Sequence, residues 1–418
     1  MEENDFDLFV LKLLKFQEKA RNKKVDNNGL NFNTIVGHTV PDSDVFFASA
    51  LLILSKNKFE ETLKKVQFYL ITTGDGYTAE IKGGRIIDRG LKDLDHHGIP
   101  SKTSFDLAVE ELKISGENWI QTPKRIIYNA ECKGISLPFD INEISKVIGR
   151  TKKFNDREKM EKGIKVAYFV LLFHREKMER NIEFTVKIIR NFFESRNIEM
   201  PERFKKYVEQ LENPFFQRPC DFVEVLSAAN RIKGEEEAKR IGEELLQFLL
   251  DEYNKYKEAK KGKTEKHFKI RISELTKDFI VYIENTDNPK DHVVALEDGA
   301  CAIYQRNPNG NSQIFFNSKI IRREVANEII RYLRCLENMF QGRELPPKKS
   351  LTRRGTIPEC PEWHYFLGES KGKEEQGIFI FNGSLTAPDV PKSKIPPEAV
   401  ITIIVLVTRD YLEKPGKK

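Results

Sequence analysis

Two stretches near the start of the chain place acidic and histidine side chains directly after short strand-like runs. The first covers residues 34–44 (TIVGHTVPDSD), and the second covers residues 85–98 (RIIDRGLKDLDHHG). Open α/β sheets bind ligands at the carboxyl ends of their strands, so side chains that follow two neighbouring strands should meet at one edge. The pattern predicts an α/β domain with a mostly parallel sheet and a polar site at that edge.

The side chains in these stretches are ligands that divalent cations use. Carboxylate oxygens and imidazole nitrogens converging on one site suit a pair of manganese-type ions. Two such ions can hold both the attacking water and the leaving oxygen of a phosphate ester. The competing interpretation is that the histidines are ordinary and the aspartates cap helices. It is disfavoured because the chain has only seven histidines, and three of them fall in these stretches.

The same residues resemble the signatures of a known superfamily. HTVPDSD (residues 38–44) is similar to the first signature of the DHH phosphoesterases, and Asp95-His96-His97 is the tripeptide that names them. The superfamily includes RecJ-type nucleases, oligoribonucleases, cyclic-dinucleotide phosphodiesterases and family II inorganic pyrophosphatases. IIDRG followed closely by LDHHG also resembles the melanocyte-proliferating-gene type of exonuclease, whose first signature differs. The resemblance covers roughly the first third of the chain and implies a DHH-type sheet domain.

The resemblance also implies which residues bind the metal pair. His38 and Asp42 would ligate one ion, and Asp44 and His96 the other. The full set of expected ligands is His38, Asp42, Asp44, Asp88, His96 and Glu131. The bridging carboxylate is either Asp88 or Asp75. Asp88 is favoured because its strand leads directly to the DHH tripeptide, whereas Asp75 stands between two glycines, as a turn residue would.

The remaining roles are those of the catalytic residues and the downstream ligand. Asp95 would not bind a metal ion itself but would hydrogen-bond to a ligating imidazole and fix its tautomer. His97 would contact the scissile phosphate as a donor. Glu131 is the first candidate for the acidic ligand downstream, although the superfamily usually has aspartate there. Asp140 is the second candidate, but the better interpretation is that it caps the helix that follows it.

The composition is that of an ordinary soluble protein. With 418 residues the chain is too long for one core, which predicts two domains. A net charge of +6 is compatible with an acidic partner without requiring one. The five cysteines are widely spaced and form no CxxC pair, so we interpret them as buried or incidental thiols in a reducing compartment. The acidic start and the lack of a long apolar run predict a cytoplasmic protein.

A change in hydrophobic period divides the chain. Helical spacing dominates residues 152–262, whereas short strand-like runs, among them residues 292–298, follow residue 267. We therefore expect a DHH phosphoesterase domain over residues 1–262, with an N-terminal helix at residues 5–20. A smaller α+β domain, which binds substrate, is expected over residues 263–418. The charged run 257–266 is interpreted as the linker, and the apolar run 399–412 as a helix.

The second domain should decide the substrate. Many RecJ and oligoribonuclease relatives carry a Gly-Gly-Gly-His type loop there, and this chain lacks one. Substitutes are expected in the basic loop at residues 346–355 and near residue 382. The expected substrate contacts are Arg353, Arg354, Asn382 and Ser384. Trp363, Tyr365 and Phe379 offer stacking surfaces, although burial in the core is their favoured interpretation.

These features together predict a two-metal hydrolase of phosphodiesters in short nucleic acid or a nucleotide, of the phosphodiesterase or exonuclease type. The expected cofactor is two Mn2+ ions, with Mg2+ as the alternative. Two other functions stay open, an inorganic pyrophosphatase or nucleotide phosphatase and an inactive DHH-like binding or regulatory module. No membrane partner is expected, and both a monomer and a dimer stay open.

Overall fold

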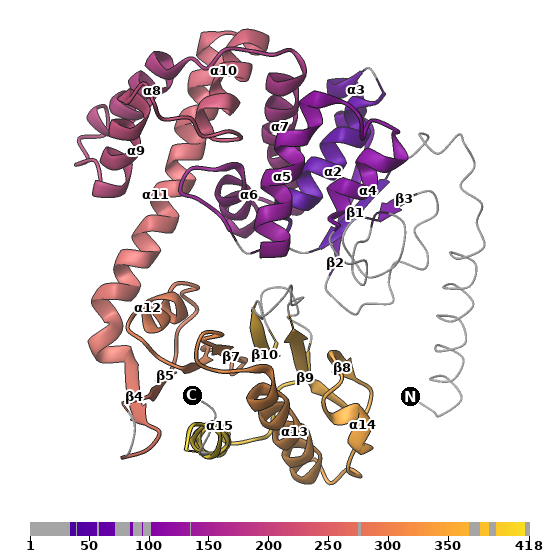
Figure 1. Cartoon of the computed structure of the whole chain (residues 1–418), viewed down its shortest axis with the longest axis vertical. Helices are drawn as coiled ribbons and strands as arrows, with labels where there is room; N and C mark the ends of the chain where they lie inside the picture. Colours follow the sequence, from indigo (N-terminus) through magenta and orange to yellow (C-terminus); the bar gives the residue numbers. More distant parts are fainter. Residues whose placement is uncertain are drawn as a thin grey trace. The chain divides into compact units, whose positions relative to one another are not determined.

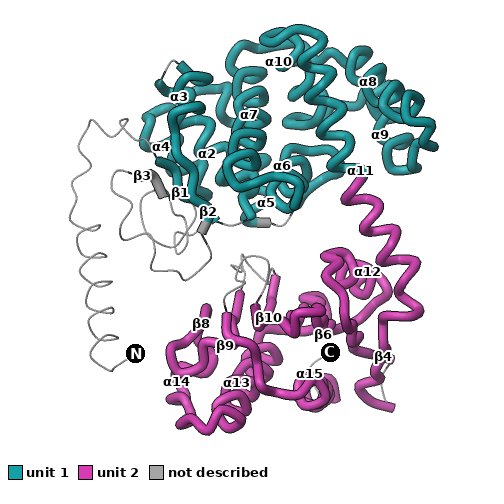
Figure 2. The backbone as a smooth tube through the Cα atoms, turned by 180° about the vertical axis from the view of Figure 1, so that it is seen from behind, with its two compact units in different colours: residues 1–250 teal, residues 251–418 magenta. Residues whose placement is uncertain are grey.

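The computed structural model describes residues 34–38, 40–56, 58–71, 84–86, 94, 102–133, 135–274, 277–367, 377–383 and 390–413. Two compact units make up the chain, Met1–Leu250 and Asp251–Lys418 (Figure 2). The division lies within the long helix α11 (Glu235–Lys266), which also contains the boundary expected at residue 262. The helix expected at residues 5–20 lies outside the described residues. No helix among the described residues is long and apolar enough to cross a membrane.

The first unit contains a parallel sheet. Its described strands are β1 (Thr34–His38), β2 (Gln67–Ile71) and β3 (Gly84–Ile86). They lie in the order β2-β1-β3, with β1 parallel to both neighbours. Val36 of β1 pairs with Tyr69 on one side and with Ile86 on the other. The carboxyl ends of all three strands therefore meet at one edge, and the predicted mostly parallel sheet is confirmed.

Helices make up most of the rest of the first unit. They are α2 (Ser43–Leu54), α3 (Phe59–Lys65), α4 (Ser104–Glu111), α5 (Asn118–Lys133), α6 (Ile141–Arg150), α7 (Asp156–Arg175), α8 (Ile182–Glu194), α9 (Glu202–Glu212), α10 (Phe222–Lys233) and α11. Helix α2 has the sequence SDVFFASALLIL and is buried over almost its whole surface. It lies beside β1 and between α4 and α7 (Figure 1). The predicted helical region, α7 to α11, is confirmed.

Residues 257–266 are helical, so their interpretation as a linker is wrong. They form the last turns of α11. Lysine, glutamate and alanine have high helix propensities, and a single glycine costs only about 1 kcal/mol relative to alanine. A Cβ atom at Gly262 would meet only the Lys266 side chain, at 3.6 Å, so the packing of the helix does not require glycine there.

The second unit is built on one mixed sheet with the strand order β4-β5-β6-β7-β10-β9-β8. Its strands are β4 (His267–Arg271), β5 (Phe279–Ile283), β6 (Ala302–Arg306), β7 (Ser312–Phe316), β8 (Gly355–Ile357), β9 (Cys360–Leu367) and β10 (Ile378–Asn382). Its helices are α12 (Asp291–Glu297), α13 (Arg323–Phe340), α14 (Lys348–Leu351) and α15 (Pro397–Leu412). Only β5 and β6 pair in parallel among the described strands of this sheet. The predicted smaller α+β domain is confirmed, as is the helix at its end.

Side chains from both faces of this sheet are buried. Helices α13 and α15 share one hydrophobic cluster with the sheet, and Trp363 and Tyr365 are fully buried in it, as predicted. On the other face, Ala295 of α12 packs with Val281 and Ile303. Residues 292–298 were expected to form a strand, and this was wrong. Their β-branched run suggested a strand, but the segment instead forms the short crossover helix between the parallel strands β5 and β6.

His364 of β9 makes the stability of the second unit depend on pH. Its imidazole stacks on Phe381 at 5.5 Å between ring centroids, and burial, reinforced by the charge of Arg334, lowers its pKa from 6.5 to about 4. The unfolded chain therefore takes up a proton near pH 6.5, whereas the folded unit does so only near pH 4. Hence the free energy of unfolding rises with pH across this window and falls as the pH is lowered.

In the wild type, His364 should lower the free energy of unfolding by at most about 3 kcal/mol when the pH falls from 7 to 4. We expect His364→Gln to lack this pH-dependent loss. Urea denaturation at several pH values would measure this. The chain has two tryptophans, Trp119 in the first unit and Trp363 in the second, so a Trp119→Phe background makes the fluorescence report on the second unit alone. An unchanged pH slope in the variant would refute this assignment.

Candidate metal centre

The turn between β1 and α2 holds two of the predicted ligands. His38 is the last residue of β1, and Asp42 is the N-cap of α2. The Oδ1 atom of Asp42 accepts hydrogen bonds from the backbone N–H groups of Asp44 at 3.1 Å and Val45 at 3.4 Å. Aspartate is a favoured N-cap because its carboxylate satisfies N–H groups that have no partner within the helix. The cap thus fixes where the Asp42 side chain points.

The second carboxylate oxygen of Asp42 faces His38. Its Oδ2 atom lies 3.5 Å from Nε2 of His38, and the two side chains are 17% and 22% exposed, with His38 the less exposed. Both groups therefore reach the surface of the first unit at the carboxyl end of the central strand of the sheet. The structure brings together the two residues that were expected to share one metal ion.

Asp44 is fully buried at the start of α2. Its Oδ2 accepts the backbone N–H of Ser104 at 2.7 Å, and its Oδ1 accepts that of Phe105 at 2.8 Å. These are the first two residues of α4, whose N-cap is Thr103. A carboxylate at the amino end of a helix is stabilised by the helix dipole and by these donors. Asp44 thus joins the amino ends of α2 and α4, a contact that no local sequence pattern indicates.

Helix α6 packs tightly against the turn that holds His38 and Asp42. A Cβ atom built on Gly149 would lie 2.0 Å from the carbonyl oxygen of Pro41. No side chain fits in that space, so only glycine permits this approach of two backbones. Pro41 is buried in the turn itself. The position of the turn therefore depends on a glycine more than 100 residues away in the sequence.

The structure does not describe most of the other predicted residues of the first unit. Asp75, Asp88, Asp95, His96 and His97 are outside the described residues. Glu131 is half-buried near the end of α5, and Sγ of the adjacent Cys132 lies 4.0 Å from the carbonyl oxygen of Lys102, just before α4.

Asp140 is the N-cap of α6, as the sequence favoured. Its Oδ1 accepts the N–H of Glu143 at 2.8 Å, and its Oδ2 accepts that of Leu137. Burial raises the pKa of this carboxyl above its ordinary value, against the opposing effect of these hydrogen bonds. Asp140 therefore serves as a structural counterpart of Asp42, with the same capping role on another helix.

In the second unit, Arg353 and Arg354 are exposed, and Ser384 lies outside the described residues. The loop that carries the two arginines is held by the fully buried Arg334 of α13. Its guanidinium donates hydrogen bonds to the backbone carbonyls of Ser350, Leu351, Arg353, Gly355 and Trp363. Burial lowers the pKa of Arg334 to about 10, so it remains charged at neutral pH. Arg334 therefore fixes the backbone of the basic loop.

Asn382 has a structural position. Its side chain is fully buried, and its Nδ2 donates to the carbonyls of Glu362 at 2.7 Å and Pro391 at 2.8 Å. Its Oδ1 accepts the N–H of Ser393 at 3.1 Å. In this structure the Asn382 amide ties β10 to its neighbouring segments and offers no surface to a substrate.

A second group of ligand-type side chains was not recognised as a group in the sequence. His174 lies beside Cys220 and Glu224. Cys220 stands just before α10 and Glu224 in its first turn, and this spacing of four residues is the only sequence signal that could have suggested their association. The contact with His174 joins segments that are far apart in the chain.

Neither a family model nor a curated protein matches the sequence. Among solved structures, the chain is similar to RecJ from Thermus thermophilus in complex with Mg2+, with 11% identity and a TM-score of 0.35 over 96% of this chain and 52% of that one. The chain thus spans about half the length of the RecJ structure. It is also similar to the DHH domain of a member of a family of ribosomal proteins, with 11% identity and a TM-score of 0.40 over 99% and 93% of the two chains.

Proposed function

We propose that this chain is a divalent-metal-dependent phosphoesterase that hydrolyses a phosphodiester in short nucleic acid or a nucleotide. The observation that carries the proposal is the pairing of His38 Nε2 with Asp42 Oδ2 at the carboxyl end of the central strand of a parallel sheet. Open sheets of this kind bind ligands at that edge. The two DHH-like signatures in the sequence support the same chemistry.

The distance between the two donor atoms fits a shared metal ion. Ligands about 2.0–2.1 Å from one ion at angles between 90° and 120° are ~2.9–3.6 Å apart. His38 Nε2 and Asp42 Oδ2 are 3.5 Å apart, which falls within that range. An imidazole and a carboxylate are ligands that Mn2+ accepts, and Mg2+ is the alternative. The pair therefore fits as half of a metal centre, with Mn2+ as the proposed ion.

The pairing of β1 with β3 supports Asp88 as the bridging ligand of the proposal. The described part of β3 ends at Ile86, which pairs with Val36 in parallel. Asp88 follows two positions later in the sequence, and two residues span ~7 Å at most. The proposal assigns the second ion to Asp44 and His96, with Glu131 as the downstream ligand. Both carboxylate oxygens of Asp44 accept backbone N–H groups, so a metal ion would have to bind the remaining lone pair of one of them.

In the proposed reaction the protein positions the phosphodiester and balances its charge. Bound divalent ions would supply acidification of the attacking water and neutralisation of charge on the phosphoryl group. Asp95 holds an imidazole in one tautomer, and His97 donates a hydrogen bond to a phosphoryl oxygen in the transition state. These roles are expectations from the sequence signatures.

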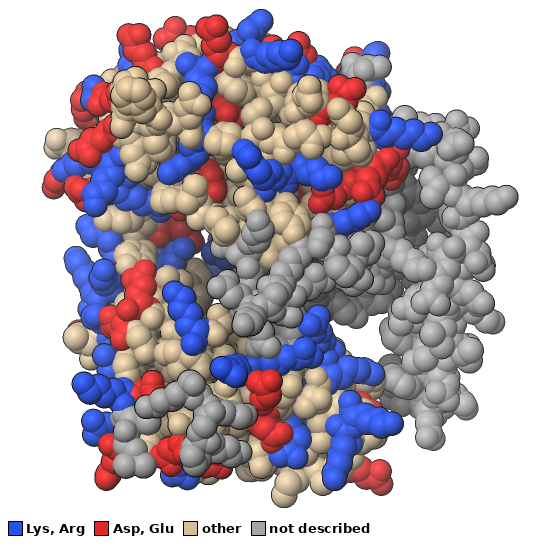
Figure 3. Space-filling model, in the orientation of Figure 1, with Lys and Arg blue, Asp and Glu red and all other residues tan. Residues whose placement is uncertain are grey.

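The basic loop of the second unit is the proposed contact for the substrate's phosphates. Arg353 and Arg354 are exposed beside Lys348 and Lys349 of α14, and Lys and Arg side chains gather around α14 (Figure 3). Guanidinium groups bind phosphate with two parallel hydrogen bonds. Because the Arg334 guanidinium binds backbone carbonyls of this loop, the loop backbone would lose little conformational entropy when it binds the substrate.

The experiment is incubation of the purified full-length chain with Mn2+, Mg2+ or EDTA and a panel of short RNA, short DNA, a cyclic dinucleotide and pyrophosphate. We expect manganese-dependent cleavage of at least one phosphodiester and none in EDTA. Cleavage of pyrophosphate alone would instead identify the pyrophosphatase alternative. Metal binding without turnover of any substrate would favour a binding or regulatory module.

A further inference from the structure

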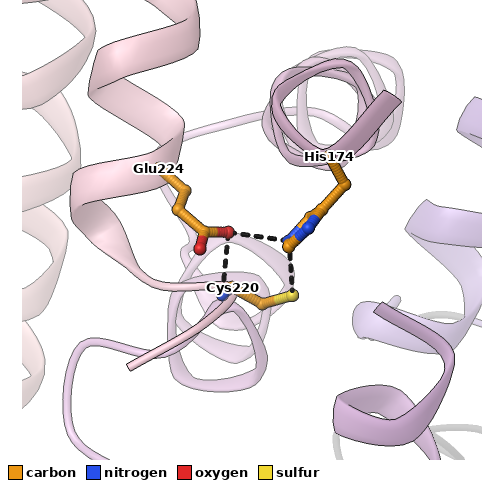
Figure 4. Close-up of side chains that lie close together, drawn as sticks. All are labelled: His174, Cys220 and Glu224. Carbon is orange, nitrogen blue, oxygen red and sulfur yellow. Dashed lines mark hydrogen bonds and ion pairs between the residues drawn. The ribbon is translucent and has the colours of Figure 1, made fainter. Parts of the chain in front are cut away.

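Three side chains that commonly bind metals converge in the helical region of the first unit. His174 lies in the last turn of α7, Cys220 lies just before α10, and Glu224 is in the first turn of α10 (Figure 4). His174 Nε2 is 2.9 Å from Glu224 Oε2 and 3.5 Å from Cys220 Sγ. All three point toward one another, and the cluster shares no residue with the centre at β1 and α2.

The surroundings of the cluster leave one negative charge without a permanent partner. Asp221 is fully buried and Glu224 nearly so, and both carboxylates are paired with the single guanidinium of Arg180, at 2.8 Å and 3.3 Å. The hydroxyl of Tyr207 donates to Asp221 but carries no charge. Buried charges require compensation. A cation bound beside Glu224 would supply it.

We propose that His174 Nε2, Cys220 Sγ and Glu224 Oε2 form a binding site for a zinc-type transition-metal ion. In tetrahedral zinc sites, bonds of about 2.0–2.1 Å to nitrogen and about 2.3 Å to sulfur place these two atoms ~3.5 Å apart. The observed separation is 3.5 Å. The nitrogen and oxygen ligands would be ~3.3 Å apart, against 2.9 Å here. The nitrogen–oxygen pair is therefore a few tenths of an ångström from that geometry, and all three ligand atoms lie within 4.8 Å of one another.

The backbone holds Cys220 in an uncommon conformation that keeps it in the cluster. Its φ is +53°, a left-handed value that costs energy for a residue with a side chain. The Cys220 N–H donates to Glu224 Oε2 at 2.8 Å, and its carbonyl accepts the N–H of Ile141 at 2.9 Å. Both backbone groups are therefore fixed. The thiol is fully buried, while the His174 side chain is 16% exposed, which leaves a solvent-facing side for a fourth ligand.

A divalent ion balances the charge of this cluster. A thiolate, Glu224, Asp221, Arg180 and one divalent cation sum to zero. Cys220 is fully buried. Full burial also excludes it from attack on a substrate. Coordination removes the thiol proton outright, which makes binding dependent on pH.

The ligand set also selects the kind of ion. Thiolate and imidazole favour zinc, cobalt and similar ions over Mg2+ and Mn2+, which prefer oxygen ligands. The site is therefore chemically distinct from the centre proposed at His38 and Asp42. Three protein ligands and one open position are the arrangement in which zinc also binds water.

Cobalt titration of the purified full-length chain tests this inference. Co2+ replaces zinc in such sites and gives a thiolate-to-cobalt charge-transfer band in the near ultraviolet. We expect the band to saturate at one equivalent and to disappear when Zn2+ is added. Cys220→Ser and His174→Gln should each weaken cobalt binding by at least ~100-fold. Cys360→Ser, which changes a buried thiol of the second unit, is the matched control and should retain the band.

Two results would overturn the inference. One is the absence of a thiolate-to-cobalt band in the wild-type protein, a readout that does not depend on any variant folding. The other is a band of unchanged intensity in Cys220→Ser. Asp42→Asn is the control from the other centre and should leave the band intact.

Discussion

Asp42→Asn is expected to lower manganese-dependent phosphodiester hydrolysis by more than about 100-fold, since even residues that only support a metal ligand cost 10–100-fold. Asparagine is as good an N-cap as aspartate. Its side-chain oxygen can still accept the N–H groups of Asp44 and Val45, so α2 keeps its start. The change removes only the negative charge that faces His38. Turnover of the most active substrate in the panel, measured over a range of Mn2+ concentrations, is the readout.

Asp140→Asn is the matched control. Asp140 also caps a helix, but both of its carboxylate oxygens accept backbone N–H groups, so asparagine should destabilise α6 more than it does α2. Hydrolysis by the folded protein should nevertheless stay within a few-fold of the wild type. Equal loss of activity in both variants would mean that general destabilisation caused the effect. Full activity in Asp42→Asn would show that this carboxylate does not bind the catalytic ion, and the proposed function would fail with it.

Gly149→Ala is expected to destabilise the first unit by about 3 kcal/mol and to inactivate the enzyme even in its folded fraction. The added methyl would meet the carbonyl of Pro41 at 2.0 Å, and a backbone carbonyl cannot move away as the end of a side chain can. Pro41 lies between His38 and Asp42 in the chain, so any shift changes their 3.5 Å separation. Denaturant unfolding and hydrolysis below the transition would measure the two effects separately.

Gly262→Ala provides the comparison. It makes the same chemical change within a helix, but the added methyl would meet only the Lys266 side chain at 3.6 Å. Alanine has the higher helix propensity, so this variant should be neutral or more stable by up to about 1 kcal/mol. If Gly149→Ala were as stable and active as Gly262→Ala, the close packing of α6 on the turn would have no role in the site.

Features encoded locally could be predicted from the sequence. The strand at residues 34–38, the helix α2 after it and the change to short strands after residue 267 all follow from hydrophobic period and turn residues. The pairing of His38 with Asp42 is also local, because a cap and a strand end four residues apart lie close together. Residues 292–298 show the limit, since the crossover between β5 and β6 decided their conformation against the apparent local preference. Residues 257–266 differ, because their helix propensities outweighed the single glycine.

The long-range contacts could not be predicted. Nothing near Gly149 indicates that Pro41 packs against it, and nothing near Asp44 indicates that it satisfies the N–H groups of α4. Likewise, the burial of Asn382 follows from its partners at residues 362, 391 and 393. Such contacts depend on how whole elements pack, which a period or motif within a single segment does not specify.

The burial of α2 on nearly all sides has a consequence during protein synthesis. Its apolar surface is covered in part by α7, which begins about 100 residues after α2 ends. At about 5–20 residues per second, a ribosome needs ~5–20 s to make the intervening chain. Throughout that interval the apolar surface of α2 in the nascent chain is exposed to solvent and to other proteins. The same apolar sequence that later holds the turn with His38 and Asp42 in place thus makes the growing chain dependent on protection from aggregation.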